Sequence, residues 1–283
     1  MIKIAIMLLV HNNEDQVNRL IKHLSNDFDV YVHIDKRCSI KIIKQENIFI
    51  YKRFNTYHGS FNQIMATLYL LREAFEHGYD RYVLISGQDL PIKTNAEIKL
   101  FFNNNDIEYL NITKIPDPNS GWPDMKRLTS YNLNYKYHKK SSSIIIKYLI
   151  KIIRKILFII SKIMPRKLDY DFYGGDNWTN YTHNCVKKIF EYLKSDKKYI
   201  KRYKWTSCAD EIFYQTIINK IDGIIIEKSS LRYIDWNNGP EYPKILRIED
   251  YEKIINSNSL FARKFDANVY NDVIEMIYKN ITI

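Results

Sequence analysis

The first 115 residues alternate between short apolar runs and amphipathic segments, and this alternation constrains the fold more than any other feature of the sequence. Residues 2–10 read IKIAIMLLV, whereas residues 14–24 read EDQVNRLIKHL, with apolar residues at helical spacing. The same change of period recurs along this half of the chain. Strands separated by helices favour an α/β fold with a mostly parallel, doubly wound sheet, whose ligands bind at the carboxyl ends of the strands.

The remaining elements follow from the apolar period and from the residues that start or stop helices. Further strands are expected at residues 29–35, 48–53, 81–86, 108–115, 223–229 and 231–236. Further helices are expected at 60–78 (closed by Gly78), 95–102 (opened by Asn95), 181–195, 206–220, 247–257 and 262–279.

One domain is expected over residues 1–283. Hydrophobic residues make up 46% of the sequence, which is enough for a core, and no internal repeat or linker rich in Gly, Ser or Pro divides it. The alternation stops at residues 116–140, where prolines and a Gly-Trp-Pro turn stand among aromatic and basic residues. Residues 116–182 are therefore expected to be an insertion that contains this loop and an amphipathic helix.

Residues 143–164 are the expected insertion helix, and isoleucine, leucine, phenylalanine and tyrosine fill most of its positions. Six of its remaining residues fall in one arc of the helical wheel: Lys147, Lys151, Arg154, Lys155, Ser161 and Lys162. Basic residues interrupt the apolar run too often for a membrane span. Two interpretations remain open: a basic helix at an anionic membrane surface, or a helix whose apolar face is buried against the domain.

The charge and the cysteines restrict the partners and the compartment. A net charge of +11 suits nucleic acid, anionic lipid or phosphorylated small molecules. Cys38, Cys185 and Cys208 form no C-x-x-C pair, which fits a reducing compartment. The apolar run after Met1 is expected to be a first strand and not a signal peptide, so a cytoplasmic location is expected.

The stretch LISGQDLPIKT contains an apolar run that ends abruptly in polar residues, as a buried strand does when it delivers a loop to a site. Enzymes that use nucleotide-sugars often carry two aspartates there, spaced D-x-D, to hold a metal on the diphosphate. This chain has one, Asp89. The pairs Asp27/Asp29 and Asp169/Asp171 do read D-x-D, but neither leaves a buried strand. No metal site is therefore expected.

The segment TSCADEIFYQTI supplies a candidate base. Ser207 and Asp210 have the spacing of a capping box, so a helix is expected to begin here with Glu211 in its first turn. The positive end of the helix dipole favours an ionised Glu211, which can then take a proton from a hydroxyl. Capping alone also explains this pattern. Arg232 and Lys264 are candidate cations for a departing diphosphate, and solvated surface charge is the alternative for each.

In order along the chain, seven segments resemble the core-2/I-branching glycosyltransferases, glycosyltransferase family fourteen, and the chain looks like a bacterial member. This family includes β-1,6-N-acetylglucosaminyltransferases and peptide O-xylosyltransferases. The similar segments are LLVHNNEDQVNRLIKHL, YVHIDKR, YHGSFNQIMATLYLL, LISGQDLPIKTNAEI, GGDNWTNYTHNCV, CADEIFYQTI and LFARKFD.

The resemblance implies a GT-A-type fold, a UDP-sugar donor, inversion at the anomeric carbon and no metal. Glu211 matches the catalytic base and Asp35 a nucleoside contact. The basic residues that hold the diphosphate match Lys264 and Arg232, although these two lie further apart here than in the animal branching enzymes. Other donor-side candidates are His11, Ser60, Gln88 and Asp89; for Asp89, capping of the following turn is the alternative. Candidates for acceptor contacts are Trp122, Lys126, Arg127, Asp176 and Trp178.

The leading hypothesis is an inverting transferase that moves N-acetylglucosamine from its UDP-sugar to a glycan or lipid-linked glycan in bacterial surface polysaccharide synthesis. One alternative keeps the fold and uses UDP-xylose or UDP-galactose. Another is a non-catalytic basic module that binds membrane or nucleic acid. The aromatic residues are spread along the chain and form no stacking platform, so nucleic acid is not expected as a partner.

Overall fold

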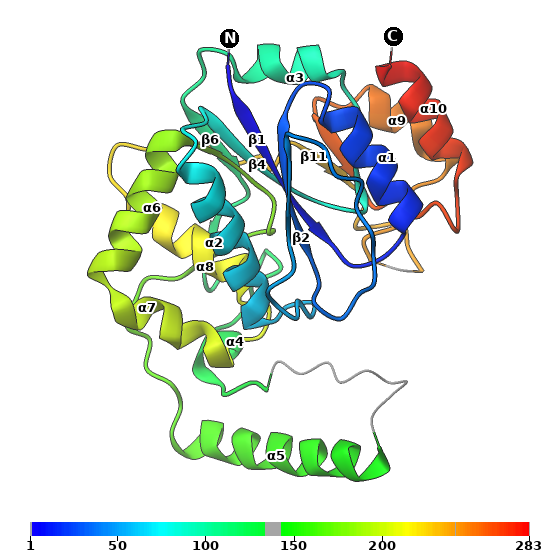
Figure 1. The fold of residues 1–283 in the computed structure, drawn as a ribbon. Helices are drawn as coiled ribbons and strands as arrows, with labels where there is room; N and C mark the ends of the chain where they lie inside the picture. The colour runs from blue at the N-terminus through cyan, green and yellow to red at the C-terminus, as the bar shows by residue number, and fades with distance from the viewer. Residues whose placement is uncertain (1, 134–142, 241, 283) are drawn as a thin grey trace.

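A computed structural model describes residues 2–133, 143–240 and 242–282, and Figure 1 shows helices on both faces of a central sheet. In this part of the chain the central sheet has seven strands. Their order is β10 (Ile225–Glu227), β6 (Ile107–Leu110), β9 (Thr179–Thr182), β4 (Arg81–Ser86), β1 (Ile4–Val10), β2 (Asp29–Ile34) and β3 (Ile48–Tyr51).

The mostly parallel sheet expected from the sequence is confirmed, with one antiparallel strand. β1 pairs in parallel with β2 and β4, β2 with β3, and β10 with β6. β9 runs antiparallel between β4 and β6. Its residues, 179–182, were expected to belong partly to the next helix, so this part of the prediction was wrong. The end of the insertion thus enters the middle of the sheet.

Both faces of the sheet are buried, as the continuous apolar run of β1 requires. Along this strand Ile4, Ile6, Leu8 and Val10 face one half of the core, and the residues between them face the other. The first half is covered by α1 (Glu14–Leu24), α3 (Asn95–Phe102), α9 (Tyr251–Ile255) and α10 (Asp272–Ile281). The second half is covered by α2 (Phe61–Phe75), α6 (His183–Ser195), α7 (Lys197–Arg202) and α8 (Asp210–Ile218).

Two smaller sheets correct the strand predictions. β5 (Asp89–Pro91), β12 (Phe261–Arg263) and β11 (Arg232–Ile234) form a three-stranded sheet in which Arg263 lies opposite Asp89. Residues 261–263 are thus a strand, and the last helix begins only at Asp272 instead of at residue 262. The expected strand 108–115 is divided into β6 and β7 (Thr113–Lys114), and β7 pairs with β8 (Tyr173–Gly174).

The insertion contains α4 (Lys126–Thr129) and α5 (Ile144–Ile163). The helix expected at 143–164 is confirmed, with the Ser143 side chain accepting a hydrogen bond from the backbone of Ile146. Residues 134–140 of the expected loop lie outside the described residues. Among the residues that are described, no helix has both the length and the apolar character needed to cross a membrane.

The helix caps differ in detail from those expected. Thr94 caps α3 in a capping box with Glu97, so Asn95 is the first helical residue and not the cap. α8 does begin at Asp210, but its cap position is Ala209, and Ser207 makes no capping hydrogen bond. The expected helix at 247–257 is a short 3₁₀ turn, η2 (Ile248–Asp250), followed by α9; another such turn, η1 (Tyr203–Trp205), follows α7.

Candidate active site

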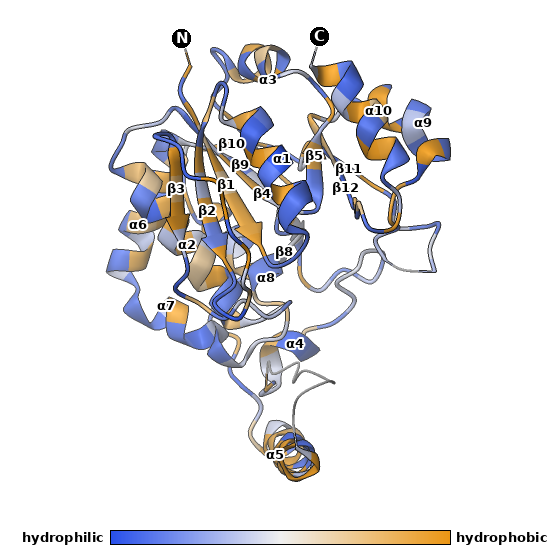
Figure 2. Cartoon of the chain, turned by 45° about the vertical axis from the view of Figure 1, so that its right-hand side comes forward, coloured by the Kyte–Doolittle hydropathy of each residue, from blue (hydrophilic) through white to orange (hydrophobic). Residues whose placement is uncertain are grey.

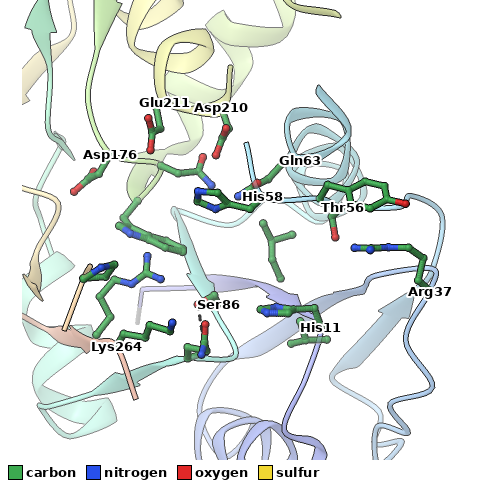
Figure 3. A pocket seen from close by; sticks show the side chains of 18 of the residues that line it. His11, Arg37, Thr56, His58, Gln63, Ser86, Asp176, Asp210, Glu211 and Lys264 are labelled. Atoms are coloured by element: carbon green, nitrogen blue, oxygen red, sulfur yellow. Dashed lines mark hydrogen bonds between the residues drawn. The ribbon is translucent and has the colours of Figure 1, made fainter. Parts of the chain in front are cut away.

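A cavity of about 980 Å³ lies at the carboxyl ends of β1, β2 and β4, where a doubly wound sheet places its ligands. His11 follows β1, Arg37 follows β2, and Ser86 and Gln88 follow β4. In Figure 3 the carboxylates of the site gather along one edge of the cavity, and Lys264, Ser86 and His11 lie across from them. The cavity therefore has an acidic side and a basic side.

Two glycines position the acidic side. A Cβ atom at Gly175 would lie 1.9 Å from the carbonyl oxygen of Asn111, and one at Gly174 would lie 2.6 Å from the ring of Trp122. Only glycine fits at both positions, so the chain runs flush against these groups. The backbone N–H of Gly175 donates to the carbonyl oxygen of Glu211 at 2.9 Å. This contact joins the segment that carries Asp176 to the first turn of α8.

Three carboxyl groups line the acidic side: Asp176, Asp210 and Glu211. Burial raises the pKa of Asp176, which accepts a hydrogen bond from the Asn111 side chain at 2.8 Å. Complete burial, together with the neighbouring Glu211 charge, raises the pKa of Asp210 to about 8. Asp210 is therefore protonated at neutral pH and is a poor base.

Glu211 is the carboxyl group best placed to act as a base. Burial raises its pKa, and Arg127 opposes this effect, with 3.1 Å between Arg127 Nη1 and Glu211 Oε2. The expected position in the first turn of α8 is confirmed, but the nearby positive charge comes from Arg127 in the insertion as well as from the helix end. Its side chain is 30% exposed, so a ligand can reach it.

The basic side is formed by Arg263 and Lys264. The guanidinium of Arg263 lies 4.0 Å from the centre of the Trp178 ring, and its Nε is 3.3 Å from Asp89 Oδ1. Burial lowers the pKa of Arg263, whereas Asp89 and Asp176 raise it. Burial likewise lowers the pKa of His11, and Lys264 adds to this effect. The positive charges of Arg263 and Lys264 beside His11 suit an anionic ligand.

Arg232 does not line the cavity, contrary to the expectation that it contacts a diphosphate. Its guanidinium is buried behind the site and donates to the carbonyl oxygens of Leu84 (2.8 Å) and Ser230 (2.5 Å) and to Asn180 Oδ1 (3.1 Å). Burial lowers its pKa to about 10, which leaves it charged at neutral pH. These hydrogen bonds give Arg232 a structural role, whereas Arg263 on the neighbouring strand β12 lines the cavity.

Two expected donor contacts, Asp89 and Asp35, also lie behind the cavity wall. Asp89 is fully buried and accepts hydrogen bonds from the backbone and hydroxyl of Ser86. Burial of Asp35 favours a higher pKa, but its hydrogen bonds with Arg37 hold the pKa below its ordinary value. Each carboxylate thus positions a cavity-lining neighbour: Asp89 fixes Arg263, and Asp35 fixes Arg37.

A second cavity of about 820 Å³ adjoins the first, and His58 and Arg154 line both. Trp122, Lys126 and Arg127 line the second cavity, so the three residues expected near the acceptor lie together. The Arg127 guanidinium lies 4.7 Å from the centre of the Trp122 ring and, as shown above, contacts Glu211. Asp176 and Trp178 lie instead in the first cavity.

Several expectations concern residues outside both cavities. Ser60 precedes α2, and its buried hydroxyl has no hydrogen-bond partner among the described residues. Asp27 bonds to Lys99, Asp29 accepts from Tyr79, and exposed Asp171 pairs with Lys114. Neither D-x-D pair lines the site. Among the described residues, no group of three or more His, Cys, Asp or Glu side chains could hold a metal ion.

Three further residues line the cavity that were not predicted from the sequence: Arg263, Asp210 and Arg37. The first two are neighbours of expected residues, in ARKFD and ADE, and Arg37 follows the strand-end aspartate in HIDKR. Each of the three residues lies at or near a strand end or a helix start, and this position is the signal that could have identified it. Asp210 is more deeply buried than Glu211, and no pattern in the local sequence indicates this difference.

The chain matches a family model described as Core-2/I-Branching enzyme over residues 4–255. It belongs to this family. The resemblance drawn from the seven segments is therefore confirmed. The described α/β structure, with its central sheet between layers of helices, is compatible with the GT-A-type fold expected of a core-2/I-branching enzyme.

Two relatives illustrate how far the family relationship extends. Beta-glucuronosyltransferase GlcAT14A of Arabidopsis thaliana is 26% identical over 278 residues, which cover 92% of this chain and 57% of that protein. Human xylosyltransferase 2 is 21% identical over 311 residues, which cover 98% of this chain and 33% of that protein. The chain thus spans only part of the length of these relatives.

Proposed function

We propose that this core-2/I-branching enzyme is an inverting glycosyltransferase that uses a UDP-sugar donor. The observation that carries the proposal is that Glu211 and Lys264 lie across one cavity from each other, as Figure 3 shows, and that Arg263, the residue before Lys264, lines the same cavity. A transferase needs a base on the acceptor side and positive charge on the leaving-group side. The names of both relatives, a glucuronosyltransferase and a xylosyltransferase, support the same reaction class.

In this mechanism Glu211 takes the proton of an acceptor hydroxyl as its oxygen attacks the anomeric carbon. The bond between that carbon and the β-phosphate oxygen breaks at the same time, so the configuration inverts. UDP leaves with an added negative charge, which Arg263 and Lys264 stabilise. Burial favours the protonated form of Asp210, whereas the ion pair with Arg127 favours the ionised form of Glu211.

We propose that these two cations make a metal unnecessary. Asp89, which stands where a D-x-D sequence would be expected, is buried and engaged with Ser86 and Arg263. UDP release from the donor is expected to survive EDTA. Activity that is lost in EDTA and restored by manganese would contradict this part of the proposal.

The decisive test is a thermal-shift panel with UDP, UMP, GDP and an oligonucleotide, each with and without EDTA. Selective stabilisation by UDP supports the transferase, because a ligand that binds only the folded chain raises its melting temperature. A shift with the oligonucleotide alone supports the non-catalytic basic module instead. UDP release should then be measured with UDP-N-acetylglucosamine, our proposed donor, and with the UDP-linked forms of xylose, galactose and glucuronic acid.

We further propose that the acceptor is a glycan or lipid-linked glycan of a bacterial surface polysaccharide, and that transfer takes place on the cytoplasmic side of the membrane. The three cysteines, all free, support a reducing compartment. The Trp122 ring and the bases around it in the second cavity offer an apolar surface and hydrogen-bond donors to a sugar ring and its substituents.

A further inference from the structure

Helix α5 carries an apolar face that the described chain leaves uncovered. Ile145, Ile152, Ile156, Ile159 and Ile163 follow one side of the helix, and each is between 47% and 73% exposed. Figure 1 shows α5 lying apart from the central sheet, and Figure 2 shows it end-on below the rest of the described chain. A stripe of this length on a monomer indicates an interaction surface.

The opposite face of α5 is turned toward the site. Lys147, Ile150 and Arg154 line the first cavity, and Arg154 also lines the second. The hydroxyl of Ser161, on this same face, accepts a hydrogen bond from the Tyr131 backbone N–H at 2.8 Å. These contacts fix the orientation of α5 about its own axis. The isoleucine face therefore points away from both cavities.

The charge of α5 indicates which kind of partner the isoleucine face binds. The helix has five basic residues and no acidic residue between Ile144 and Ile163. Two copies packed along this face would bring like charges together, whereas an anionic surface would attract them. Lys151, Lys155 and Lys162 are exposed and lie along one edge of the apolar stripe, an arrangement that suits headgroup phosphates beside acyl chains.

We propose that α5 lies in the surface of a bilayer that contains anionic phospholipids, with the isoleucine face toward the acyl chains. Because the other face of the same helix lines both cavities, docking brings them beside the headgroups. The surface then delivers membrane-borne acceptors to the site. That role rests on the proposed function, but the docking itself does not.

The test is flotation of the full chain with vesicles of phosphatidylcholine, with or without phosphatidylglycerol, at low salt. Binding only to the phosphatidylglycerol vesicles is expected. Replacing Lys151, Lys155 and Lys162 with glutamine should weaken binding roughly a hundredfold, at about 1 kcal/mol for each base near the surface. The matched control removes the same charge from α6 and α7, with Lys187, Lys194 and Lys197 changed to glutamine, and should bind like the wild type.

A second variant tests the apolar contact: Ile152→Ser, Ile156→Ser and Ile159→Ser together. It is expected to lose vesicle binding and to keep the wild-type melting temperature, because these side chains are already exposed. The proposal is overturned if the wild type does not float with phosphatidylglycerol vesicles, or if the control loses as much affinity as the α5 lysine variant. The proposal is also overturned if the isoleucine variant has a lower melting temperature than the wild type. The same holds if the wild type sediments as a dimer and the isoleucine variant as a monomer.

Binding of UDP is measured in parallel on each variant without vesicles. It is expected to be unchanged, because none of the substituted residues lines a region assigned to the donor. Vesicle binding without UDP binding would refute the proposed function and leave the docking surface intact. UDP binding without vesicle binding would refute the docking surface and leave the proposed function intact.

Discussion

We predict that Arg127 sets the pH range in which Glu211, the proposed base, is ionised, and Arg127→Met tests this relationship. Burial raises the pKa of Glu211, while the ion pair with Arg127 lowers it. Removing Arg127 therefore raises this pKa further, and less of Glu211 is ionised at any pH on the acid side of the activity profile. The acid limb of kcat/KM should move to higher pH, and the variant should approach the wild type once Glu211 is fully ionised in both.

The expected loss in kcat/KM follows from the solvent exposure of the Arg127–Glu211 ion pair. The two side chains are 43% and 30% exposed and 3.1 Å apart, so solvent screens them. Such a pair contributes about 0.2–1 kcal/mol, which corresponds to a loss of about 1.4- to 5-fold in kcat/KM on the acid limb. The assay is UDP release from the donor across a pH series at constant ionic strength.

Two controls separate ionisation from other effects of this substitution. Lys126→Met removes a neighbouring cation of the same cavity that has no contact with Glu211, and should leave the acid limb in place. Arg127→Lys keeps the charge and should restore most of the wild-type profile. If Arg127 acts only on the acceptor, kcat/KM will fall equally at every pH, and an acid limb that stays fixed or moves to lower pH refutes the reasoning.

Glu211→Gln should lower turnover by about a hundredfold or more and leave UDP binding intact, and near-normal turnover would exclude Glu211 as the base. Lys264→Ala should weaken UDP binding in calorimetry; unchanged affinity would remove Lys264 from the diphosphate site. Arg232→Met should instead destabilise the fold by on the order of 3 kcal/mol, because buried acceptors lose their donor, and an unchanged denaturation midpoint would contradict this. Asp210→Asn should weaken the pH dependence of stability. From about pH 4 to about pH 8, the folded wild type keeps a proton on Asp210 that the unfolded chain has released, so the stability of the wild type falls as pH rises. Asparagine does not titrate, so the variant lacks this contribution. Equal slopes of melting temperature against pH for the two proteins would contradict the raised pKa of Asp210.

The regular part of the fold could be predicted because its signals are local. The bounds of α1 and α3 match the expected ranges, since each helix carries its own apolar period or capping residues. The short strands β5, β8 and β9 were missed. Four residues reading TNYT have no period of their own, and they form β9 because β4 and β6 supply partners on both sides.

The site was predicted in part, for a different physical reason. Glu211, Lys264, Gln88 and His11 do meet in one cavity, because strand ends and helix starts converge there. The direction of a side chain depends on its partners, and these are distant in the sequence. Arg232 turns toward the carbonyl oxygen of Leu84 and away from the cavity, and no local pattern specifies that choice.

The position of β9 in the sheet has a consequence for synthesis. β9 pairs with β4 at a separation of about a hundred residues along the chain, and it also closes the gap to β6. A nascent chain that has emerged only as far as the insertion can assemble β1 to β4, but it leaves the edge of β4 with unpaired backbone groups. The ribosome must deliver the whole insertion, including the isoleucine-rich α5, before that edge is covered. An early contact of α5 with a bilayer would then hold the incomplete chain at a surface while β9 is still to come.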